Sequence, residues 1–109
     1  MDEYVEKFVA DTRRKVGIRR RLRKEDYLAY DDVISHPYHM ADSTDDALLI
    51  LDCIEDTFRR RWMLYGKQED ANLAGHAAMV SSAFRSAETL VTSDEPVNPH
   101  DLLKGKLRR

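Results

Sequence analysis

Apolar residues recur along this chain at intervals of three and four positions, which is the spacing of an amphipathic α-helix. The cleanest run lies between residues 73 and 91, where successive gaps are 4, 3, 4, 3 and 4. This a/d spacing keeps one side of a helix facing a partner helix. The residues of this seam are Leu73, Ala77, Val80, Phe84, Ala87 and Val91.

A second helical stripe comes before this seam, with Ala47 first and with Leu48, Ile50 and Cys53 widening it. A serine or threonine at residues 43–44 is a good N-cap, and Gly66 is suited to end the helix. The sequence therefore predicts an antiparallel helical hairpin of about residues 45–65 and 70–92. The residues that this first arm is expected to place in the core or in an interface are Leu51, Ile54, Phe58 and Trp62.

Shorter helices are expected on either side of the hairpin. One covers residues 2–16 and ends at Gly17, a second covers residues 24–35 and ends before Pro37, and a third begins at Asn98. We expect an all-α fold, a compact bundle of four to five helices around the hairpin. Residues 1–109 would form a single domain, with a flexible basic tail over about residues 104–109.

Composition narrows the class of protein and its location. The chain has 109 residues, of which 42% are hydrophobic and 35% charged, enough apolar residues for one core. The longest apolar run, residues 47–51, is far short of the ~20 residues that a membrane span needs. No signal peptide is visible, and the single cysteine cannot form an internal disulfide. We therefore expect a cytoplasmic protein that does not enter a membrane.

The net charge is only −2, but the charges are strongly segregated. Eight of the twelve residues 13–24 are basic, and residues 25–56 contain ten acids without a lysine or arginine. A basic block of this density can bind phosphates, which makes it a candidate nucleic-acid or polyanion site. The alternative is that the acidic segment neutralises it within the fold or across a dimer. The candidate residues are Arg13, Arg14, Lys15, Arg19, Arg20, Arg21, Arg23 and Lys24.

Catalytic chemistry has little support in the sequence. His36 and His39 form an HxxH pair, but a zinc site needs three or four ligands and no other ligand stands at a diagnostic spacing. No glycine-rich phosphate loop and no nucleophile elbow is present. The acids of residues 52–56 share a helix face, although the more ordinary role for two of them is i, i+4 pairing with Arg59 and Arg60. We expect no catalytic residue, no metal and no cofactor.

Three functional hypotheses follow. The leading one is a small non-catalytic interaction or regulatory accessory protein that binds another protein and itself, because the hairpin offers more apolar surface than two short helices would cover. The second is a nucleic-acid-binding accessory factor that uses residues 13–24. The third is a small metal-dependent helical hydrolase built on the acids of residues 42–56 with a nearby histidine.

Overall fold

The computed structural model describes residues 3–91, with side chains described to residue 87. The elements in chain order are α1 (Glu3–Asp11), a π-helical turn η1 (Thr12–Val16), α2 (Lys24–Ser35), a 3₁₀ turn η2 (Pro37–His39), α3 (Thr44–Tyr65) and α4 (Gln68–Val91). Over this range every regular element is helical, which confirms the all-α prediction. The helix predicted from Asn98 and the basic tail at 104–109 lie outside the described residues.

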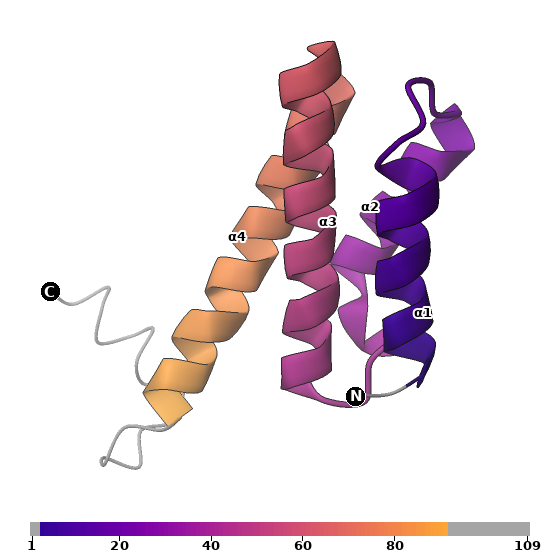
Figure 1. The fold of residues 1–109 in the computed structure, drawn as a ribbon. Helices are drawn as coiled ribbons and strands as arrows, with labels where there is room; N and C mark the ends of the chain where they lie inside the picture. Colours follow the sequence, from indigo (N-terminus) through magenta and orange to yellow (C-terminus); the bar gives the residue numbers. More distant parts are fainter. Residues whose placement is uncertain (1–2, 92–109) are drawn as a thin grey trace, which may run out of the picture.

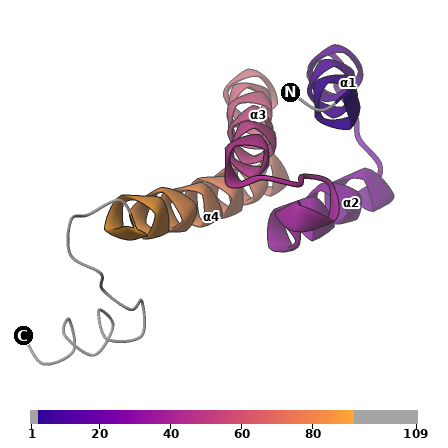
Figure 2. The ribbon, with the colours of Figure 1, turned by 90° about the horizontal axis from the view of Figure 1, so that it is seen from below.

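The predicted hairpin is confirmed as the pair α3 and α4, which run antiparallel and make the most extensive contact between helices. Figure 1 shows α3 in the middle, with α4 on one side and α1 on the other. In the view from below in Figure 2, α2 lies below α1 and beside α4. In this arrangement α1 and η1 pack on α3, whereas α2 packs on α4.

The ends of α3 follow from its own sequence. The side chain of Ser43 caps the first turn by accepting a hydrogen bond of 3.1 Å from the backbone N–H of Asp46. At the other end Gly66 has a φ of +67°, and its N–H donates to the carbonyl of Trp62 at 2.8 Å. Only glycine adopts this left-handed conformation without steric cost, so α3 ends where glycine stands.

The core is centred on Phe58 of α3, which is fully buried. Tyr30 of α2 meets its ring edge-on at a centroid distance of 5.2 Å, and Tyr27 lies at 6.0 Å. Phe8 of α1 lies 5.7 Å from Tyr30, and the Tyr30 hydroxyl is 2.9 Å from Oγ1 of buried Thr12. Tilted and edge-on ring contacts among three helices therefore fix how α1 and α2 sit on the hairpin.

Part of the predicted apolar seam is buried and part is not. In α3, the side chains at 51, 54 and 58 are fully buried, but Trp62 is 47% exposed, so its placement in the core was wrong within this chain. In α4, Leu73 and Ala77 are buried, the side chains at 80 and 84 are partly buried, and Ala87 is exposed. Val91 belongs to α4, but its side chain lies outside the described ones. The seam therefore packs only over the first part of α4.

Two helix boundaries differ from the predicted ones. Gly17 has ordinary helical dihedrals, and its N–H donates to the carbonyl of Thr12 at 3.0 Å, so the chain widens into a π-turn instead of stopping in a left-handed cap. Glycine is required there for space, because an added Cβ would lie 2.6 Å from the Arg13 carbonyl oxygen. The helix α4 begins at Gln68, earlier than predicted. Asp70, in its first turn, is buried.

Among the described residues, no helix is both long and apolar enough to cross a membrane.

Two glycines give a matched stability test. Gly66→Ala should lower the free energy of unfolding by about 1–2 kcal/mol, because alanine is strained at positive φ. Gly75→Ala should raise it by about 0.5–1 kcal/mol, because Gly75 lies within α4 with nothing within 4 Å of an added Cβ. Urea unfolding followed by circular dichroism measures both. Effects of the same sign at the two positions would contradict the assigned backbone conformations.

Candidate interaction surface

The basic segment is divided between two structural contexts. Residues 13–15 lie on η1, and residues 17–23 form a turn that leads into α2 at Lys24. We call residues 17–24 the basic turn. The side chains of all eight basic residues of the segment are exposed. Ile18 at the start of the basic turn is also exposed, to 78%. The turn therefore presents cations together with one large apolar side chain.

A buried arginine holds the basic turn in place. Arg61 of α3 is fully buried, and its Nε donates to Oδ1 of Asp70, also fully buried, at 3.1 Å. The Tyr27 hydroxyl donates to the same oxygen at 2.8 Å. Burial and the neighbouring Asp70 together raise the pKa of Tyr27, so it stays protonated as the donor at neutral pH. This cluster connects α2, α3 and α4 through polar contacts.

The remaining donors of Arg61 bind the backbone at and just before the turn. They reach the carbonyl oxygens of Val16 at 2.9 Å and of Arg20 at 3.2 Å, and also that of Arg19. Lys67 adds a longer bond to the Arg20 carbonyl at 3.4 Å. Because these carbonyls are bound from inside the fold, the turn is held against the end of α3. The backbone N–H groups of residues 20–22 have no acceptor within the described part of the chain.

The acidic segment does not neutralise the basic one within this chain. Four of its ten acids pair instead with residues outside the basic segment: Asp31 with His76 at 3.0 Å, Asp52 with Arg85 at 2.5 Å, and residues 55 and 56 with arginines one turn later. The exception over the described residues is the pair of Arg23 and Asp26, which caps α2. Its hydrogen bonds lower the pKa of Asp26. Most of the basic side chains of residues 13–24 are therefore not neutralised by the acidic segment and can bind a partner.

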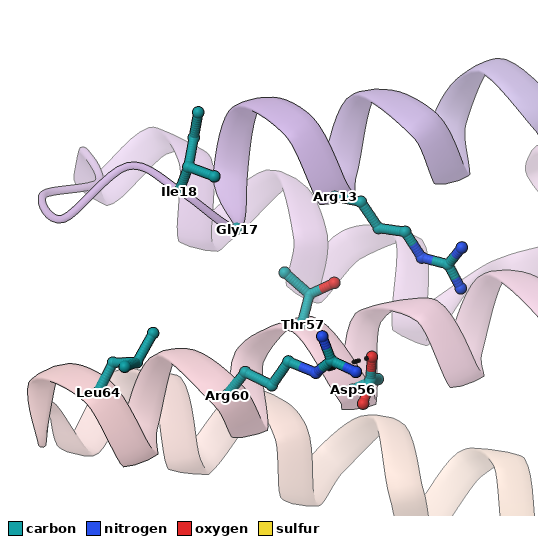
Figure 3. A pocket seen from close by; sticks show the side chains of 7 residues that line it. All are labelled: Arg13, Gly17, Ile18, Asp56, Thr57, Arg60 and Leu64. Atoms are coloured by element: carbon teal, nitrogen blue, oxygen red, sulfur yellow. Dashed lines mark ion pairs between the residues drawn. The ribbon is translucent and has the colours of Figure 1, made fainter.

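A hollow of about 530 Å³ lies between η1 and the C-terminal half of α3 (Figure 3). Arg13 approaches it from η1, and Arg60 approaches it from α3, where Arg60 also pairs with Asp56 at 3.3 Å. Its apolar lining comes from Ile18 and Leu64, and Leu64 is 69% exposed. The hollow thus combines two cations with exposed aliphatic surface, which suits an acidic and apolar binding partner.

The candidate metal-ligating residues are not gathered into a site. The rings of His36 and His39 stack at 4.9 Å, and over the described residues no group of three or more His, Cys, Asp or Glu is placed to hold a metal ion. Asp52 instead belongs to a hydrogen-bonded cluster between α3 and α4. The Ser81 hydroxyl donates to Asp52 at 3.1 Å, and Arg85 donates to both Ser81 and Asp52. The Cys53 thiol is buried, and burial raises its pKa.

The sequence reasoning missed Arg61 and Asp70. Residue 61 follows Phe58 by three positions and so lies in phase with the buried stripe, but the neighbouring tryptophan was chosen because it is apolar. Asp70 stands where the second arm was expected to begin, and it was not among the expected core residues. The helical spacing of the buried residues could have indicated the burial of Arg61, because it places this charged residue on the same side of α3 as Phe58.

Comparison with protein-family models, with curated proteins and with solved structures found no match.

The buried pair can be tested by removing its cation. Arg61→Met should lower the free energy of unfolding by about 3–5 kcal/mol, because it leaves Asp70 charged and buried without its partner. The double variant Arg61→Met/Asp70→Asn should recover part of this loss, because the isolated charge is gone. Chemical denaturation measures both variants.

Arg60→Met is the matched control, because that side chain is exposed and should cost no more than about 1 kcal/mol. Equal losses for Arg61→Met and Arg60→Met would show that the buried pair does not stabilise the fold.

Proposed function

We propose that this chain is a small non-catalytic accessory protein of the cytoplasm that acts by binding another protein and that works as a homo-oligomer. The binding surface for the other protein is the basic turn, and its partner presents an acidic segment. The observation that carries the proposal is the attachment of the turn to Arg61 through the carbonyls of residues 16, 19 and 20.

This attachment favours binding because it orders the backbone of the turn before any partner arrives. A partner then does not bear the full entropy cost of ordering that backbone on association. The guanidinium groups of residues 19–21 and 23 can form paired hydrogen bonds with carboxylates, and Ile18 supplies adjacent apolar contact. A mixture of aromatic, aliphatic and arginine contacts is typical of protein interfaces.

The absence of a catalytic role is part of the same proposal. Three of the six acids considered for metal-dependent hydrolysis, Asp52, Glu55 and Asp56, each bind an arginine. Cys53 is buried with a raised pKa, which disfavours the reactive thiolate. These contacts support structural roles for the residues that could otherwise be assigned to chemistry.

A photo-crosslinking amino acid at position 21 tests protein binding through the turn. In an extract of the source cells, irradiation should give discrete adducts whose added mass is not a multiple of the 12.7 kDa chain. Changing Arg19, Arg20 and Arg23 to Ala in the same chain should abolish them. The matched control carries the crosslinker at Met79 of α4, which is 73% exposed. Identical adducts from both positions, or none from position 21, would overturn the proposed surface.

A second candidate function is nucleic-acid binding through the same turn. It is favoured by the exposed arginines and by the backbone N–H groups of residues 20–22, which have no acceptor in the described part of the chain. Both kinds of donor suit phosphate oxygens. A sequence pI of 6.1 counts against a dedicated DNA-binding protein, so this function ranks second.

Titration of labelled duplex DNA and RNA across a salt series tests the second candidate. If the four arginines at 19, 20, 21 and 23 each neutralise one phosphate, changing all four to Ala should reduce the slope of log K against log salt by about 3.6 for duplex DNA. Arg85→Ala, whose side chain binds Asp52 on the hairpin, should leave the slope unchanged. Binding that is undetectable even at low salt would remove nucleic acid from consideration.

A further inference from the structure

The outer side of α3 is a helix face that no other described helix covers. Its exposed residues recur at helical spacing along nearly the whole helix, and the apolar ones among them are Leu49 at 41% and Met63 at 75% exposure. Figure 2 shows this side of α3 open, with α1 to one side, α4 to the other and α2 behind. The residues that define this outer face are Asp45, Leu49, Asp56, Arg60 and Met63.

The two ends of the outer face carry opposite charge. At its start, Asp42, Asp45 and Asp46 have no ion-pair partner among the described residues. At its other end, Arg13 and Arg14 of η1 also lack an acidic partner over that range, and Arg13 lines the same hollow as Arg60. Each end therefore offers charges that the chain itself leaves unpaired.

The hollow of Figure 3 lies at the basic end of this face. Its volume of about 530 Å³ is large enough for side chains from one turn of another helix, and its lining combines arginine with aliphatic surface. The start of α3 has the complementary composition, with Asp45 and Asp46 followed within one turn by Leu49. One end of α3 thus matches the hollow beside its other end.

We infer that a second copy of this chain binds this face in antiparallel orientation, with the two-fold axis near Asp52. Each α3 then places its acidic first turns at the hollow of the other copy, between Arg13 and Arg60. Asp45 and Arg60 are separated by 15 residues, about 22 Å along the helix, so both charge contacts form at once in a symmetric pair. This inference rests on the self-association in the proposed function and names its surface.

A second copy fits this face better than an unrelated acidic protein does. The required acids already lie on the same face of the same helix, at a fixed distance from the basic end. A two-fold pair satisfies both ends of both helices, whereas a single acidic partner would satisfy only the basic end. The arrangement also leaves the two basic turns free for another binding partner.

Sedimentation velocity on the full chain at tens of micromolar tests the interface. The unmodified chain should sediment as a dimer, and Leu49→Glu or Arg60→Glu should raise the dissociation constant about tenfold or more through like-charge contacts. Combining Arg60→Glu with Asp45→Lys should restore much of the dimer, because the reversed charges are again complementary. Met79→Glu adds the same charge at an exposed side chain of α4, outside this face, and should leave the dimer intact.

Cysteine crosslinking locates the axis independently of charge. In a Cys53→Ala background, Asp52→Cys should give a disulfide-linked dimer on mild oxidation, because a residue next to the axis faces its own copy. Met79→Cys in the same background should give little. Circular dichroism confirms that each variant remains helical.

The outcomes separate the interface from the wider function. A dimer that survives Leu49→Glu and crosslinks through position 79 overturns this interface and leaves self-association standing. A monomer at tens of micromolar overturns both, whereas protein binding through the basic turn is judged by the crosslinker at position 21.

Discussion

The contact between Arg61 and Asp70 is the interaction on which the arrangement of the helices depends. It joins α3 to the start of α4, Tyr27 adds α2, and the Val16 carbonyl adds the end of η1. Removing two charges from water is costly, and the attraction between them offsets that cost only when further hydrogen bonds complete both groups. Arg61 is completed by three backbone carbonyls, whereas Oδ2 of Asp70 has no hydrogen-bond partner among the described residues. The pair therefore specifies one geometry more than it adds stability.

This buried cation also explains the exposed ones. Because Arg61 binds the carbonyl side of the turn, the arginines that follow Val16 remain at the surface. Arg23 pairs with Asp26, whereas the arginines at 19–21 have no ion-pair partner among the described residues. The charge segregation along the sequence thereby becomes a segregation in space, with a basic end near the C-terminus of α3 and an acidic end at its N-terminus. Both the proposed partner surface and the proposed dimer depend on that separation. The hairpin acts as the rigid spacer between the two ends.

Local chemistry explains which parts of the fold could be predicted. The end of α2 follows from Pro37, and the bounds of α3 follow from the Ser43 cap and Gly66, because each residue acts on its own backbone neighbours. Which of residues 61 and 62 is buried could not be predicted from their neighbours in the sequence. Hydrophobicity favoured Trp62, whereas the packed structure buries Arg61, because only a long cation reaches both Asp70 and the turn. Burial of a charged residue depends on a partner that lies elsewhere in the chain.

The sequence by itself determined the helical class, the hairpin and the separation of charge, because periodicity, caps and composition are properties of neighbouring residues. Only the tertiary structure decided which charges are used inside the fold and which remain available. Asp70, which stands where the second arm was expected to begin, is buried. Of the ten acids of residues 25–56, which were candidates to neutralise the basic segment, only Asp26 pairs with it over the described residues, and four pair with residues elsewhere. The physical reason is that ion pairing depends on distance in space, and residues 16, 27, 61 and 70 become neighbours only after the helices have packed.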